Sequence, residues 1–289
     1  MPGPRMIMPM TAEARPGLYR LLSWLSPNFP IGAFSYSHGL EAAFADGTVG
    51  DAASLEGWIA ALVAQGSGRM DADILVATYR ASEGGQLAAL DAANRRGLAF
   101  RATAELALES AQQGDAFLAT CRAAWPEPFI EEWASANPPP QTGEGRLGAN
   151  LREDEPTDSL QAPNLTLPRL RGRGEQAEEM AGQRRGAAAD AVCHSAVFGA
   201  VAARAGIALG DALIGYLQNF AANLVSAGLR LGIVGQTDGQ RILAVLEPMV
   251  AQAATAALAR DAADFGAATF AADLASMAHE SQYMRLFRS

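Results

Sequence analysis

Lysine is absent from this chain: all 22 basic residues among the 289 are arginines. A Schiff-base enzyme and a Walker-type phosphate loop both need the lysine amine, so these two classes are excluded. Acidic residues outnumber basic ones and give a formal net charge of −9. Without a clustered basic face, that charge argues against a nucleic-acid-binding protein.

Cysteine and histidine are scarce. Cys121 and Cys193 lie far apart and form no CxxC motif, so a disulfide scaffold is not indicated. His38, His194 and His279 form no HxxxH or HExxH pair, so no two of them share a helix face suited to a metal. Cys193 and His194 are neighbours, and on a helix such side chains point about 100° apart. A metal site assembled between two chains stays open.

Long apolar runs and strand patterns are also missing. The N-terminal stretch has no apolar run of the length that a signal peptide needs, and polar residues interrupt the longest apolar segments elsewhere. We therefore expect no membrane span and a cytoplasmic protein. β-branched residues are sparse and period-2 alternation is absent, so strands are not expected.

Helical periodicity is what the sequence does have. Leucines recur with the spacing i, i+3, i+4, i+7 over residues 17–25, and Ser26-Pro27 ends that pattern. Residues 51–81 predict two helices, with Asp51 or Ser54 as the first cap. Three long helices follow residue 187, the last beginning near Gln240 and capped by Thr237 or Asp238. The sequence thus predicts an all-α protein with a single domain, residues 1–289, of about eight to ten packed helices.

Two segments fall outside this helical pattern. Residues 1–16 hold four prolines and predict a flexible N-terminal arm. Residues 136–186 mix proline, glycine, seven arginines and eight acidic residues without periodicity. Such a composition cannot bury enough apolar surface to offset its conformational entropy, so it predicts a disordered insertion. Its "RLRGRG" run would suit phosphate or RNA, but the adjacent "EQAEE" favours a solvated linker.

Two further segments, residues 26–44 and the C-terminal tail, are polar and aromatic, and a glycine-rich loop lies between them in the sequence. "SPNFPIGAFSYSHGLEAAF", residues 26–44, supplies hydroxyls beside a histidine but lacks the GxSxG context of a hydrolase. "GQTDGQ", residues 235–240, does not match a phosphate loop. In the tail "HESQYMRLFRS", His279, Tyr283 and Leu286 recur at helical spacing beside Arg285 and Arg288. Aromatic residues and arginine together are typical of interface hot spots, so the tail predicts protein–protein contact.

Three motifs together resemble the urease accessory protein UreF family. They are "LLSWLSPNFPIGAFSYSHGLE", "FAANLVSAGLRLGIVGQTDGQRILAVLEP" and "SMAHESQYMRLFRS", which occur in this order and span roughly 80% of the chain. The stretch from Ala136 to Gly186 departs from the family pattern, in which a much shorter connection joins the helices.

The resemblance implies an all-helical protein without catalytic activity or cofactor. Members of the family are similar in acting as dimeric scaffolds for nickel insertion into urease. They bridge the nickel-delivering GTPase UreG and UreD (also called UreH), which binds the urease apoprotein, and they are linked to control of UreG. A C-terminal partner-binding tail, residues 276–289, follows from the same resemblance.

The two motif-bearing ends and the "GQTDGQ" loop supply the expected partner-binding residues. These are Phe34, Tyr36, Ser37, His38, Glu41, Gln236, Asp238, Arg241, His279, Glu280, Tyr283, Arg285, Leu286, Phe287 and Arg288. The alternative is a nickel-binding metallochaperone that uses His38, His194, His279 or Cys193, and a third possibility is an all-helical enzyme with an unrecognised site.

Overall fold

The computed structural model describes residues 16–136 and 191–289, and both stretches are helical without a strand. The all-α prediction is therefore confirmed for them. The expected arm except Pro16, which begins α1, and the expected insertion except Ala136, which ends α7, lie outside the described residues. The elements are α1 (Pro16–Trp24), η1 (Ala33–Ser35), α2 (Leu40–Ala45), α3 (Ala52–Gln65), α4 (Ser67–Glu83), α5 (Leu87–Ala99), α6 (Ala104–Ala124), α7 (Pro128–Ala136), α9 (His194–Arg204), α10 (Leu209–Arg230), α11 (Gln236–Ala259), η2 (Ala262–Asp264) and α12 (Phe270–His279).

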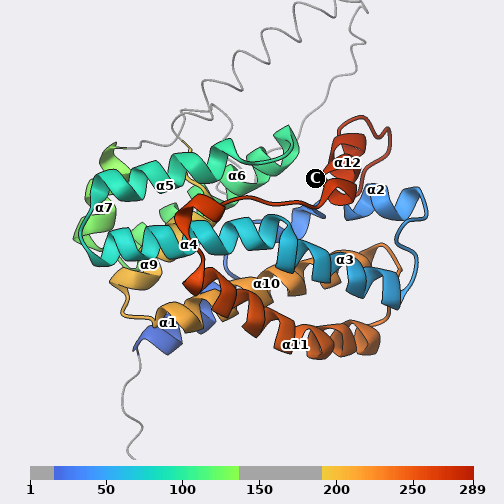
Figure 1. The fold of residues 1–289 in the computed structure, drawn as a ribbon, viewed down its shortest axis with the longest axis horizontal. Helices are drawn as coiled ribbons and strands as arrows, with labels where there is room; N and C mark the ends of the chain where they lie inside the picture. Colours follow the sequence, from blue (N-terminus) through green and yellow to red (C-terminus); the bar gives the residue numbers. More distant parts are fainter. Residues whose placement is uncertain (1–15, 137–190) are drawn as a thin grey trace, which may run out of the picture.

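Helix α4 runs through the middle of the molecule and contacts α3, α5, α9, α10 and α11 (Figure 1). Helix α9 is buried from His194 to Ala202, which explains its almost uniformly apolar sequence. The two helices approach closely at Gly199. A Cβ there would lie 2.5 Å from the Thr78 hydroxyl and 2.6 Å from the Leu75 carbonyl. The small residues of α9 therefore allow the backbones to pack directly.

The N-terminal helix α1 is held by aromatic contacts. Trp24, which is 2% exposed, makes edge contacts with Phe117, Trp125 and Phe198. These rings come from α6, its C-terminal end and α9. The leucine periodicity of residues 17–25 thus predicted a helix correctly. The contacts of Trp24 show where that helix packs.

Helix ends test the capping predictions. Asp51 and Ser54 cap α3 together: the Ser54 amide donates to Asp51 Oδ1 at 2.8 Å, and the Asp51 amide donates to Ser54 Oγ at 3.1 Å. The prediction for α11 is wrong. That helix begins at Gln236 after Gly235, so Asp238 lies in its first turn and pairs with Arg241 at 2.6 Å. The Gly235 carbonyl already accepts the Gly239 amide at 2.9 Å, so the helix starts there.

Among the described residues, α11 is the one helix that is long and apolar enough to cross a membrane. Core helices of soluble proteins meet the same two criteria. Here one face of α11, with Ile242, Leu246 and Val250, is buried, and the helix packs against α10, α3 and α4.

Candidate functional site

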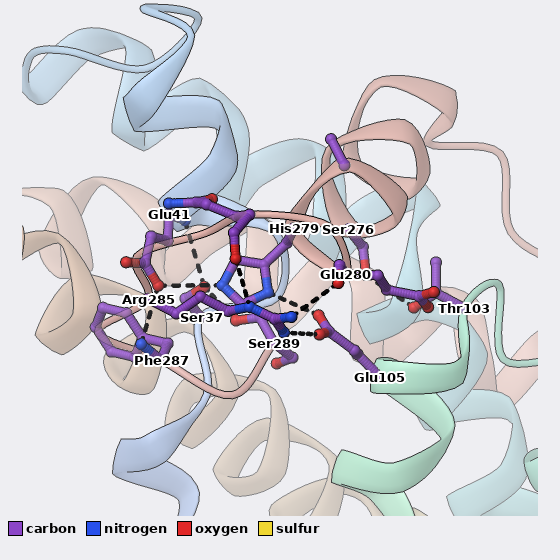
Figure 2. A network of polar contacts seen from close by, with 12 residues as sticks. Ser37, Glu41, Thr103, Glu105, Ser276, His279, Glu280, Arg285, Phe287 and Ser289 are labelled. Atoms are coloured by element: carbon purple, nitrogen blue, oxygen red, sulfur yellow. Dashed lines mark hydrogen bonds and ion pairs between the residues drawn. The ribbon is translucent and has the colours of Figure 1, made fainter. Parts of the chain in front are cut away.

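The two unusual ends of the sequence meet in space, although more than 230 residues separate them. Helix α12 packs against α2, and the segment after α12 returns along the turn before α2 (Figure 2). The Ser37 amide donates to the Ser289 carbonyl at 2.8 Å, and the Arg288 amide donates to the Ser35 carbonyl at 2.8 Å. The first and third motifs of the sequence therefore form one structural unit together with the start of α6, which we call the tail clamp (residues 35–41, 103–109 and 276–289).

Glu41 lies at the centre of the tail clamp. It is in the first turn of α2 and its side chain is 8% exposed. Its Oε1 accepts the Leu286 amide at 2.7 Å, and its Oε2 accepts the Phe287 amide at 2.9 Å. One carboxylate thus supplies the acceptors for two consecutive backbone amides of a non-helical segment, which sets the path of that segment.

His279 is the last residue of α12 and is completely buried. Its Nε2 lies 3.1 Å from Glu41 Oε2, and its Nδ1 lies 2.7 Å from Glu105 Oε2. Arg285 approaches the other oxygen of the same carboxylate, Glu105 Oε1, at 2.5 Å. The imidazole therefore joins α2, α6 and α12 through charged groups (Figure 2).

A glycine and two hydroxyl side chains allow these helices to approach closely enough to form the clamp. Gly39 precedes α2 with φ of 77°, and a Cβ there would lie 2.9 Å from the Ser276 amide nitrogen. The Ser276 hydroxyl in turn lies 2.8 Å from the hydroxyl of Thr103, which caps α6. Glu280 Oε1 accepts the Ala104 amide at 3.1 Å. The start of α6 is thereby fixed to the end of α12.

One large apolar side chain of the tail is buried. Phe287 is 4% exposed, and the Arg230 guanidinium of α10 lies 4.2 Å from the centroid of its ring. Beyond it, Ser289 is buried and its hydroxyl donates to Glu109 Oε2 at 2.9 Å. The same Glu109 oxygen lies 3.0 Å from His38 Nδ1.

Other tail side chains face solvent. Tyr283 is fully exposed, Met284 is 78% exposed and Leu286 is 60% exposed. We call these three the tail anchors. Helix α12 adds an exposed apolar face at i, i+4, i+7, formed by Phe270, Leu274 and Met277. Exposed large apolar residues in such number are typical of surfaces that bind another protein.

The structure divides the expected partner-binding residues into two groups. Those that are buried are Tyr36, Ser37, His38, Glu41, His279 and Phe287. In this conformation they contact their own chain, and only the other expected residues have surface available to a partner. These are Phe34, Gln236, Arg241, Glu280, Tyr283, Arg285, Leu286 and Arg288, with Asp238 half-buried.

The helical spacing of His279, Tyr283 and Leu286 in the sequence does not extend α12 into the tail. Helix α12 ends at His279, and residues 280–289 form no helix. The Leu286 and Phe287 amides donate to a carboxylate of α2 instead of to the preceding turn of their own segment. Hydrogen bonds to Glu41 thus take the place of the hydrogen bonds that these two amides would make within a helix.

Several residues in or against the tail clamp were not among the individual partner-binding residues expected from the sequence. Glu105, Glu109, Thr103, Ser276 and Arg230 all contact the tail or its helix. In the sequence, Thr103 and Glu105 match an ordinary helix start, and nothing local distinguishes them. Their partners lie more than 170 residues away, so periodicity carries no signal for the contacts.

The candidate metal ligands lie in different surroundings. Cys193 and His194 adjoin a buried pair in which Arg101 contacts Asp71 at 2.5 Å. Burial lowers the pKa of His194 to about 4, so its imidazole is neutral at pH 7. His38 and His194 line a cavity of about 40 Å³, and His38 Nε2 has no hydrogen-bond partner among the described residues.

Residues 16–136 and 191–289 contain no group of three or more His, Cys, Asp or Glu side chains placed to hold a metal ion. His279 directs its two nitrogens at two carboxylates. The carboxylates are occupied with protein donors, so the clamp is suited to fixing a surface.

Comparison with known proteins gives a consistent result. The UreF family model matches residues 49–247. A urease accessory protein UreF of Bradyrhizobium sp. (strain BTAi1) is 36% identical over 286 residues, covering 99% of this chain and 98% of the relative. One from Bradyrhizobium sp. (strain ORS 278) is 38% identical, covering 94% and 92%. One from Rhodopseudomonas palustris (strain TIE-1) is 38% identical, covering 97% and 96%.

Proposed function

The chain belongs to the UreF family of urease accessory proteins, a non-catalytic family with a role in urease maturation, and from that premise we propose that it is a scaffold. As a homodimer in the cytoplasm, it bridges the nickel-delivering GTPase UreG and the urease-binding protein UreD, and it modulates the GTPase. Nickel is then inserted into urease by the assembled complex.

The tail clamp is the observation that carries this proposal. Residues 280–289 form no helix, yet Glu41, Glu105 and the buried Phe287 hold them in one conformation. The tail anchors meanwhile face solvent. Fixing a segment before it binds lowers the conformational entropy lost on association. A segment held on one side and apolar on the other is suited to docking a protein.

We assign the tail anchors to UreD. Tyr283 and Leu286 can fill apolar pockets, and the exposed Arg288 can pair with a carboxylate at the rim. The apolar face of α12 extends the same end of the chain. We assign contact with the GTPase or with the second copy to two other exposed places. These are Phe34 on η1 and the start of α11, with Gln236 and Arg241.

Co-purification with UreD and UreG tests the scaffold directly. The double substitution Tyr283→Ala with Leu286→Ala should abolish the UreD complex, and with it recruitment of UreG, while circular dichroism stays unchanged. Ile214→Ala on α10 is the matched control, because Ile214 is 45% exposed and lies outside the tail clamp. Full UreD binding by the double variant would overturn the assignment.

A further inference from the structure

The buried imidazole of the tail clamp has an unusual pair of neighbours. Both ring nitrogens of His279 lie within hydrogen-bond distance of a carboxylate oxygen, Nε2 of Glu41 and Nδ1 of Glu105. A neutral imidazole donates from one nitrogen and accepts at the other, whereas an ionised carboxylate only accepts. While both carboxylates are ionised, both contacts are hydrogen bonds at the same time only when the imidazole carries two protons and a positive charge.

The charges around His279 lead to the same conclusion. Glu41 of α2 and Glu105 of α6 face the ring, and Arg285 of the tail faces Glu105. Glu280 is directed at the backbone of α6 instead. With a charged imidazole, the two carboxylates are balanced by two cations. With a neutral one, a net negative charge remains among side chains that are at most 12% exposed, apart from Arg285. Burying an unbalanced charge is unfavourable.

The tail depends on this arrangement through Glu41. The same carboxylate that contacts His279 accepts the Leu286 and Phe287 amides. When the imidazole loses a proton, a nitrogen lone pair faces one of the two carboxylates. That carboxylate must then move, which removes the acceptor of the tail amides or of Arg285, or take up a proton, which makes it a weaker acceptor for them.

We propose that His279 is a positioning residue, held as an imidazolium between Glu41 and Glu105, and that the tail anchors keep their docking conformation only while this proton is bound. The surface is therefore assembled at lower pH and loosened as the imidazolium loses its proton at higher pH. The effect on partner binding rests on the proposed function, whereas the charge of His279 belongs to the free protein.

The first experiment measures that charge without any partner. The full chain is labelled with ¹⁵N-histidine, and the ring nitrogens are followed by NMR across the pH range. The chain has three histidines, and His279→Gln identifies the signal of interest. We expect both nitrogens of His279 to be protonated at pH 7, while His194 is neutral in the same spectrum. A neutral tautomer of His279 at pH 7 would overturn the proposal.

The second experiment measures the tail. Glu41→Gln keeps the shape of the side chain but removes its negative charge and replaces one acceptor oxygen with an amide NH₂ group, which only donates. Hydrogen exchange of the peptide covering residues 280–289 should become about tenfold faster or more, because charged hydrogen bonds are lost. Glu56→Gln on α3 is the control, since Glu56 lies outside the clamp. Exchange unchanged by Glu41→Gln would refute the positioning role.

The third experiment connects the proton to docking. The affinity of the wild-type chain for UreD should fall as the pH rises through the titration seen by NMR, and Glu41→Gln should be weak at every pH. A wild-type affinity that does not change across that titration contradicts the coupling. No UreD binding at any pH would overturn the proposed function and the functional half of this inference, while the charge and exchange results would stand on their own.

Discussion

Phe287 and Tyr283 lie four residues apart in the tail, and their replacement by alanine should have opposite effects. Phe287 is 4% exposed and its ring lies beneath the Arg230 guanidinium, whereas Tyr283 is fully exposed. Phe287→Ala removes a buried anchor and should destabilise the free protein. Tyr283→Ala removes only exposed surface and should leave the free protein intact.

The magnitudes separate the two cases clearly. Truncation of a buried phenylalanine costs about 3–5 kcal/mol, and loss of the cation–π contact adds about 0.5–1 kcal/mol. A change of 1 kcal/mol shifts Tm by roughly 2–4 °C in a domain of this size, so Tm should fall by at least about 6 °C. If the tail detaches before the rest unfolds, the loss is seen as hydrogen exchange of residues 280–289 instead.

For Tyr283→Ala, the change in stability should stay within about 0.5 kcal/mol, as for other exposed sites. Loss of a hot-spot aromatic should weaken UreD binding by about 2 kcal/mol or more. The assay is a thermal melt, hydrogen exchange and UreD titration of both variants side by side. Equal destabilisation by the two variants, or a Phe287→Ala protein with unchanged Tm and unchanged exchange, would refute the assignment of buried and exposed faces.

Three other perturbations have defined outcomes. Burial raises the pKa of Asp115 to about 6, so the folded state holds an extra proton between about pH 4 and 6 and stability falls as the pH rises through that range. Asp115→Asn should therefore gain about 1–2 kcal/mol at pH 7 in a denaturant titration, and no gain would contradict this. Gly39→Ala forces a Cβ to within 2.9 Å of a backbone nitrogen at φ of 77°, so it should cost at least about 1–3 kcal/mol and release α12, as seen by limited proteolysis. An unchanged melting temperature of Gly39→Ala would contradict this expectation. Deletion of residues 140–184 should leave helical content and urease activation intact, and unfolding on circular dichroism would defeat that expectation.

The sequence by itself determined the fold class and the family. Apolar residues at helical spacing are a local property, so they indicated α1 directly, and Asp51 with Ser54 marked the start of α3 within a few residues. Three motifs in order indicated the UreF family, which the full-length relatives confirm. Where local signals were weak, as in the glycine-rich turn before α11, the predicted helix start was displaced.

Only the tertiary structure decided which motif residues are buried and which face solvent. Glu41 and His279 meet across 238 residues of sequence, and neither carries a local sign of the other. Helical spacing assigned Tyr283 and Leu286 to one face of a helix, but Glu41 accepts the amides of the tail and gives it another path. From the sequence alone, Phe287 could equally have been an exposed residue. In the structure the Arg230 guanidinium lies over its ring. Burial and charge pairing arise from contacts between distant segments, so periodicity identified the segments but not the side chains that hold them together.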